Sequence, residues 1–143
     1  MLNKQLSKYL GIDFGIKKSG VSISDSNKLI SFPLETIETK NLLDYIIQLS
    51  IDENIEIIVI GKPLKLNNEI HDLEEEIFKF IKSLKIKLPN IQIERVDERF
   101  TSEISKQIIL KSGVSKKNRR DKLIIDKISA SLILESYLIQ KNK

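Results

Sequence analysis

Three acidic residues are spaced so that they could do chemistry together, and the chain has no cysteine and one histidine to accompany them. Asp13 lies inside an apolar run, Glu98 follows a later apolar run, and Asp126 lies near the start of the last helical pattern. Carboxylates without sulfur or imidazole ligands form a hard oxygen site, which suits Mg²⁺ or Mn²⁺. Two such ions about 4 Å apart activate water and stabilise a leaving oxygen in phosphoryl transfer. We therefore expect a metal site of Asp13, Glu98 and Asp126.

The residues around Asp13 alternate as in a β-strand, which we predict over residues 9–15. Leu10, Ile12 and Phe14 point to one face of this strand, and Gly11, Asp13 and Gly15 point to the other. An acid on a half-buried strand requires a cation or hydrogen-bond donors, because an unsatisfied buried carboxylate is costly. The two small neighbours leave room for a ligand or a phosphate backbone to approach.

The elements that must position the three acids follow from the remaining patterns. Parallel strands joined by a right-handed crossover helix are expected around residues 55–61 and 91–96, and Glu98 follows the second one. Residues 126, 129, 130, 133 and 137 share one face of the last helix, so Asp126 points inward if that face packs on the sheet. Because sites gather at the carboxyl ends of parallel strands, the three acids can meet there. The expected strands are 9–15, 20–25, 29–33, 55–61 and 91–96, and the expected helices are 39–53, 69–84, 101–111 and 123–140, a mixed α/β layer fold.

Length and composition indicate one globular domain over residues 1–143, large enough for a single core. The chain is 41% hydrophobic and 31% charged, and it has neither a membrane-length apolar run nor the apolar core of a signal peptide. The absence of cysteine excludes disulfides and thiolate metal sites, so a cytoplasmic location and no membrane partner are expected. The net charge of +4 permits a polyanionic partner without requiring one.

Basic residues cluster at two places near the expected site. Lys17 and Lys18 occupy the turn after Asp13, and residues 111–122 contain six basic residues and one acid. Such a run is commonly a solvated loop, but beside an acidic site it can hold phosphates, which adds affinity without sequence specificity. The candidates in this run are Lys116, Lys117, Arg119 and Arg120.

Four motifs occur in an order that resembles the YqgF family. They are residues 11–21 around Asp13, the Ile-Gly-Lys-Pro-Leu of residues 60–64, residues 97–101, and residues 126–138 beginning at Asp126. The resemblance covers nearly the whole chain and implies an RNase H-like fold, with a mixed five-stranded sheet flanked by helices. It also implies that Asp13, Glu98 and Asp126 are the catalytic acids, and that residues 62–67 form a loop beside them.

Two departures from the family pattern concern the expected substrate contacts. Ile16 stands where a threonine is common, and Lys62 stands where a leucine is common. Neither departure removes an acid. The resemblance places three further basic residues beside the site as candidate nucleic-acid contacts: Lys62, Lys65 and Arg99.

Members of this family are described as nucleases that mature the 5′ end of 16S ribosomal RNA and as Holliday junction resolvases. The resemblance therefore implies a metal-dependent nuclease acting on pre-16S rRNA, alone or on ribosomal particles, as a monomer or homodimer. A resolvase of branched DNA is the first alternative, and it would act as a dimer. A nucleic-acid-binding scaffold without turnover is the second. An ATP-binding module of the actin type shares the Asp-x-Gly-x-x-x-x-Gly pattern, but it needs two such domains.

Each acid also has a structural interpretation. Asp13 could accept hydrogen bonds from turn amides, and Glu98 could pair with Arg99 or Arg95, with Asp97 as the substitute ligand. Asp126 could be a helix N-terminal acid that the helix dipole favours.

Overall fold

The computed structural model describes residues 6–63, 68–97 and 119–142, and it contains a five-stranded mixed sheet with the strand order β3-β2-β1-β4-β5. The first three strands are antiparallel neighbours, β4 pairs parallel with β1, and β5 pairs parallel with β4. The meander and the parallel pair predicted from the sequence are confirmed. The strands are β1 (Lys8–Asp13), β2 (Lys18–Ser24), β3 (Ser31–Glu38), β4 (Ile55–Lys62) and β5 (Gln92–Asp97).

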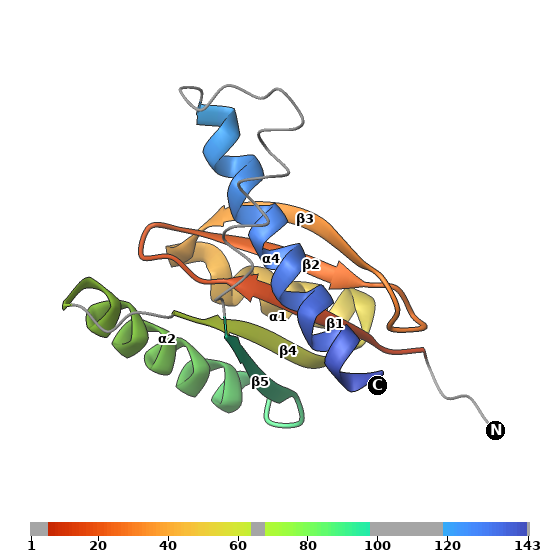
Figure 1. Ribbon diagram of the computed structural model, residues 1–143. Coiled ribbons are helices and arrows are strands. Elements are labelled where there is room, and N and C mark those ends of the chain that lie inside the picture. The colour runs from red at the N-terminus through yellow and green to blue at the C-terminus, as the bar shows by residue number, and fades with distance from the viewer. Residues whose placement is uncertain (1–5, 64–67, 98–118, 143) are drawn as a thin grey trace.

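Helices cover both faces of the sheet (Figure 1). α4 crosses one face and packs on β1, β2 and β3, and we call this side the α4 face. α1 and α2 pack on the other side, the α1/α2 face, where their apolar residues join those of the sheet. The helices are η1 (Thr39–Asn41), α1 (Leu42–Glu53), α2 (Asn68–Lys87) and α4 (Arg119–Lys141).

β4 is buried on both faces, which explains its nearly continuous β-branched sequence. Ile57 and Val59 belong to the cluster under α4, whereas Ile58 and Ile60 belong to the cluster under α1 and α2. A strand with one solvent-facing side would alternate with polar residues instead.

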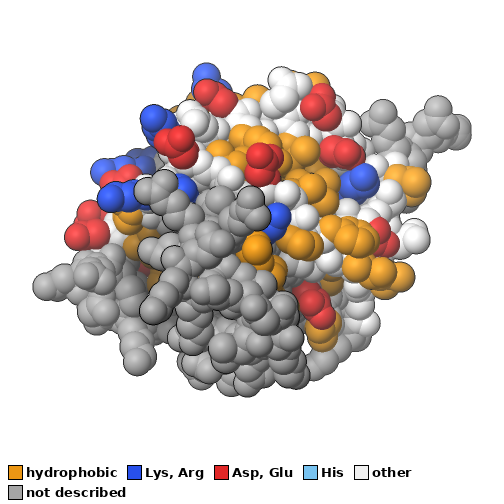
Figure 2. All heavy atoms as spheres, turned by 90° about the horizontal axis from the view of Figure 1, so that it is seen from above, with side chains coloured by type: hydrophobic (Ala, Val, Ile, Leu, Met, Phe, Trp, Pro, Cys, Tyr) orange, Lys and Arg blue, Asp and Glu red, His pale blue; other side chains and the backbone are white. Residues whose placement is uncertain are grey.

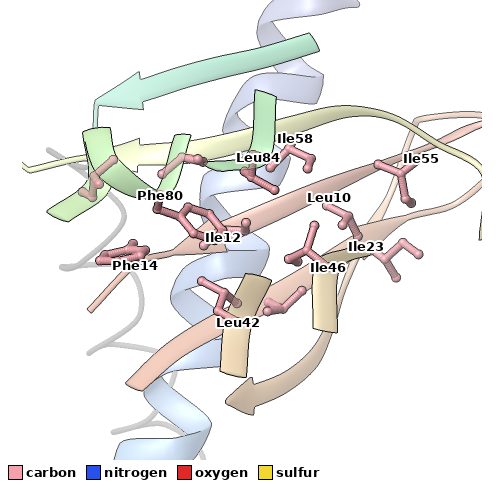
Figure 3. Close-up of a cluster of buried hydrophobic side chains, with 13 residues drawn as sticks. Leu10, Ile12, Phe14, Ile23, Leu42, Ile46, Ile55, Ile58, Phe80 and Leu84 are labelled. Atoms are coloured by element: carbon pink, nitrogen blue, oxygen red, sulfur yellow. The ribbon is translucent and has the colours of Figure 1, made fainter. Parts of the chain in front are cut away.

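The larger core lies on the α1/α2 face (Figure 3). Ile12 of β1 and Phe14, directly after that strand, meet Leu42 of α1 and Phe80 of α2. The rings of Phe14 and Phe80 lie 5.3 Å apart, centroid to centroid. Burying each such side chain contributes about 1.5–3 kcal/mol. This packing buries the face of β1 that is opposite to the face carrying Asp13, and it holds the strand in that orientation.

The bounds of β3 and α4 differ most from the sequence expectation, and α2 is also longer than the predicted residues 69–84. β3 continues to Glu38, well beyond the predicted end at residue 33, because it is an edge strand whose exposed residues show no alternation. Its pairing with β2 shifts register between Val21 and Ser22, beside Pro33, as is usual for proline in an edge strand. α4 begins at Arg119 rather than residue 123. The helix predicted over residues 101–111 lies outside the described residues.

A turn closed by Asp25 joins β2 and β3. Its Oδ1 accepts hydrogen bonds from the amides of Leu29 (2.7 Å) and Ile30 (2.8 Å). The hydrogen bond from the Ile30 amide, and to a smaller extent that from the Leu29 amide, holds the pKa of Asp25 below its usual range.

No helix within the described ranges is long and apolar enough to cross a membrane.

Candidate active site

The carboxyl ends of three parallel strands meet at one edge of the sheet. β1 ends at Asp13, β4 at Lys62 and β5 at Asp97, and the pairing of Ile12 with Ile60 and of Lys62 with Asp97 keeps these ends nearly level. In Figure 1 the arrowheads of β1 and β4 point to this edge. The strand ends are therefore close neighbours, as a site assembled from several strands requires.

Asp13 lies on the α4 face, by two independent observations. Gly11 faces α4, since a side chain there would collide with the backbone of Ala130, and Asp13 is two residues further along the same strand. Asp13 is also directly opposite Gly20 of β2, and opposite residues of an antiparallel pair project to the same face. The predicted alternation of β1 is confirmed.

Asp126 lies above Gly20, the residue that pairs with Asp13. A side chain at Gly20 would collide with the main-chain carbonyl of Asp126, so α4 lies directly on β2 at this point. Asp126 precedes Ala130 by about one helical turn and shares its inward face, where Ala130, Ile133 and Tyr137 are buried. The structure thus brings Asp13 and Asp126 to the same side of the same strand pair.

Hydrogen bonds between serine side chains and main-chain carbonyls hold α4 at this distance. The hydroxyl of Ser22 in β2 donates to the carbonyl of Ala130 (2.7 Å), and the hydroxyl of Ser31 in β3 donates to that of Ser131 (2.7 Å). Each contributes about 1 kcal/mol. Because serine side chains are short, these two bonds hold the axis of α4 close to the sheet. They also fix where Asp126 lies along the sheet.

The helix dipole does not account for Asp126. α4 begins at Arg119, so Asp126 is its eighth residue, about two turns along, and the dipole's effect fades beyond the first turn. The interpretation of Asp126 as a helix N-terminal acid is therefore wrong.

The third acid, Glu98, lies outside the described residues. Its proposed substitute Asp97 follows Val96, which is buried in the cluster under α4, so strand alternation places Asp97 on the opposite face from Asp13. Within the described residues, no group of three His, Cys, Asp or Glu side chains is arranged to hold a metal ion. Asp13 and Asp126 supply two carboxylates, and this oxygen donor set fits Mg²⁺ or Mn²⁺.

Lys17 is exposed in the β1–β2 turn and Lys18 is exposed at the first position of β2, both shortly after Asp13. Lys62 is exposed at the same sheet edge, but alternation from Ile60 places it on the α1/α2 face. Lys65, Arg99, Lys116 and Lys117 lie outside the described residues. Arg119 and Arg120 form the first residues of α4.

Arg95 forms contacts that the sequence interpretation missed. Its Nη2 donates to Glu74 of α2 (2.6 Å) and to the carbonyl of Gly61 (3.0 Å), and its Nε donates to the carbonyl of Ile60 (3.3 Å). The sequence offered Glu98 as its partner, whereas the described contacts pair it with Glu74. The sequence did contain a signal for such a contact. Arg95 shares the inward face of β5 with Ile93, and an inward-facing arginine requires a hydrogen-bonding or charged partner.

The glycines beside Asp13 have a different role from the one expected. The space at Gly11 is occupied by the backbone of Ala130 and by Leu134, and the space at Gly15 is occupied by the carbonyl of Lys18. Neither glycine leaves room for a ligand or phosphate backbone, so that prediction was wrong. Both are required because the protein's own chain passes close by.

Solved structures share this architecture. Thermus thermophilus RuvC in complex with a Holliday junction substrate superposes with a TM-score of 0.62 at 10% identity, covering 94% of this chain and 96% of that one. T. thermophilus RuvC in a second structure gives a TM-score of 0.59 at 10% identity, with the same coverage. The expected RNase H-like fold is confirmed.

The chain belongs to the RuvX family, described as Holliday junction resolvase, whose model matches residues 7–140. A "Putative pre-16S rRNA nuclease" of Bacteroides fragilis is 41% identical over 136 residues, which is 95% of this chain and 99% of that protein. Proteins of the same name from Phocaeicola vulgatus and Porphyromonas gingivalis are 40% and 39% identical over similar lengths. The resemblance to the YqgF family is confirmed, and the chain belongs to a family of enzymes that hydrolyse phosphodiester bonds.

Proposed function

We propose that this protein is a divalent-metal-dependent nuclease that processes the 5′ end of pre-16S rRNA, with Asp13, Glu98 and Asp126 as the catalytic and metal-binding residues. The observation that carries the proposal is the position of Asp126 above Gly20, the strand partner of Asp13. The names of relatives near 40% identity over almost the full chain support the RNA substrate.

The carboxylates of Asp13 and Asp126 would hold the cations from one side of the sheet, and Glu98 would complete the set from the segment after β5. When bound, two such cations supply an activated water and stabilise charge on the leaving oxygen. In the hydrolysis one oxygen–phosphorus bond forms from water, the bond to one ribose oxygen breaks, and a proton passes to that oxygen. Lys17 and Lys18 would hold the phosphates flanking the scissile bond, since lysine binds phosphate as a point charge.

Residues 1–143 would act as a single domain in the cytoplasm, where ribosomal particles assemble and present the precursor. The remaining basic candidates, Lys62, Lys65, Arg99, Lys116, Lys117, Arg119 and Arg120, would contact the nucleic-acid backbone around the cut. These contacts would contribute affinity without sequence preference.

The test compares cleavage of a pre-16S RNA by wild type, Asp13→Asn and Asp126→Asn in Mg²⁺ or Mn²⁺. We expect wild-type cutting that EDTA abolishes and that falls at least about a hundredfold in either variant, as when one essential electrostatic group is removed. Asp52→Asn, an exposed aspartate of α1, is the matched control and should cut as wild type does. Retained cutting in folded Asp13→Asn would overturn the assignment.

A Holliday junction resolvase is the second candidate, favoured by the family description and by the RuvC fold. A four-way DNA junction in the same assay distinguishes the two. Paired symmetric cuts by a dimer would move the function to branched DNA. Binding of both substrates by wild type without any cutting would instead indicate a scaffold.

A further inference from the structure

Ile16 is an exposed hydrophobic residue at the tip of the β1–β2 turn, with 57% of its surface accessible. It is also the position at which the sequence departs from the family's threonine. Grooves adjoin it on both sides, and both are lined by Ile16 and Lys40.

The first groove has an apolar floor and a charged rim. Its floor is formed by Phe14 just after β1, Leu43 of α1 and Phe80 of α2, and Lys40 and Lys79 stand at its rim. Its volume is about 320 Å³. This lies within the range of small-ligand sites, which begins at roughly 300 Å³.

The second groove continues from the first around Ile16. It is lined by Lys17, Lys18 and Lys40 with Glu38, and its volume is about 360 Å³. In Figure 2 Lys and Arg side chains lie at the left end of the face, interspersed with acidic ones, and Figure 1 places the β1–β2 turn and η1 at this end.

Positive charge predominates along this path. Four lysines line the two grooves against two glutamates, Glu38 and Glu76. The pairs Lys40–Glu38 (3.5 Å) and Lys79–Glu76 (3.3 Å) are exposed, so water and salt weaken them and their lysines remain accessible to a polyanion.

Hydrogen bonds to Thr39 fix the turn that carries Ile16 to the start of η1. The amide of Thr39 donates to the carbonyl of Lys17 (2.8 Å), and its hydroxyl donates to the carbonyl of Gly15 (2.7 Å). The hydroxyl of Ser19 is hydrogen-bonded to that of Thr39 (2.8 Å). The groove walls are therefore preorganised, and a ligand need not order them on binding.

The grooves begin where the candidate active site ends. Phe14 follows Asp13 directly, and its side chain projects to the α1/α2 face while that of Asp13 projects to the α4 face. A strand bound at Asp13 that crosses over the β1–β2 turn would reach Ile16 next.

We propose that the two grooves around Ile16 bind a single-stranded segment of the nucleic-acid substrate. An unstacked base packs against Ile16 and the edges of Phe14 and Phe80, and the adjoining phosphates contact Lys17, Lys40 and Lys79. Single strands alternate apolar base faces with phosphates, and a strip of apolar floor between lysines matches that alternation. This inference rests on the proposed nuclease function and extends its substrate path to the opposite face of the sheet.

The test measures binding of a short fluorescein-labelled single-stranded RNA by anisotropy, in an Asp13→Asn background that leaves the RNA intact. Ile16→Ser should weaken binding at least about fivefold, the lower range for loss of one stacked base. Ile86→Ser is the matched control, since Ile86 is an isoleucine on α2 that is 76% exposed, and it should bind as the background does.

The lysines are tested by the salt dependence of the same binding. Replacing Lys40 and Lys79 together by alanine should reduce the slope of log affinity against log salt by about 1.4, because each single-strand phosphate contact contributes about 0.7. Lys85→Ala with Lys87→Ala in the last turn of α2 is the control pair and should leave the slope unchanged.

Equal affinity of Ile16→Ser and Ile86→Ser would overturn the inference, as would an equal effect of Ile16→Ser on a fully paired duplex. The nuclease function is tested by a separate measurement, which is cleavage by wild type and its loss in Asp13→Asn. The two conclusions can therefore fail independently.

Discussion

At the scale of single residues, Gly20 sets the distance between the candidate acids. It pairs with Asp13 across the hairpin, and the main chain of α4 rests on it at Asp126. In the sequence it stands only as the second glycine of a turn. A glycine required by a neighbouring helix looks the same as one that makes room for a ligand, so its role was not predictable.

Gly20→Ala should destabilise the protein by about 1–3 kcal/mol, the usual cost of overpacking. The new methyl group meets main-chain atoms of Asp126, which cannot rotate away as a side chain could. α4 must therefore move from β2, and cleavage should fall with it. Urea denaturation and the cleavage assay measure both effects. An unchanged unfolding midpoint together with full activity would show that α4 does not rest on this residue.

At the scale of elements, Arg95 joins β5, β4 and α2. Its guanidinium donates hydrogen bonds to the carbonyls of Ile60 and Gly61 near the end of β4 and pairs with Glu74 on α2. The pair is largely buried, with 21% and 15% of the side-chain surfaces accessible. These contacts hold β4 in place next to its last residue, Lys62. Glu74 and Arg95 are far apart in the sequence, so no local pattern pairs them.

Glu74→Gln should lower the free energy of unfolding by about 1–2 kcal/mol, because Arg95 then loses a charged acceptor while still partly buried. Glu76→Gln is the matched control on the same helix. It breaks only the exposed pair with Lys79 and should cost about 0.5 kcal/mol or less. Chemical denaturation of both variants provides the comparison, and equal losses would contradict the special position of Glu74.

At the scale of the whole molecule, the candidate site joins the beginning of the chain to its end. Asp13 comes from the first strand and Asp126 from the last helix, and the sheet between them is held by packing on both faces. Most of this architecture follows from the sequence, because buried β-branched runs and helical apolar stripes are strong signals. β3 was predicted too short, because an edge strand exposed along its length carries no such stripe.

Binding of a divalent cation should therefore stabilise the entire fold. With the cation at a hundredfold excess over its dissociation constant, the gain is about 2.7 kcal/mol. Thermal unfolding with and without Mg²⁺ or Mn²⁺ should show a rise in Tm for wild type and for Asp52→Asn, and a much smaller rise for Asp13→Asn. A rise of the same size in Asp13→Asn would place the cation elsewhere.

The outer edge of β3 has a consequence for how copies of this protein meet in concentrated solution. Phe32 and Leu34 are exposed there, and within residues 6–63, 68–97 and 119–142 no further strand pairs with β3 on that side. A sheet edge with apolar residues invites another strand to add to it. Pro33 offers no amide hydrogen for such pairing, and Glu35 and Glu38 bring negative charge that would repel the same edge of a second molecule. We therefore expect Pro33, Glu35 and Glu38 to oppose edge-to-edge pairing between copies of this protein.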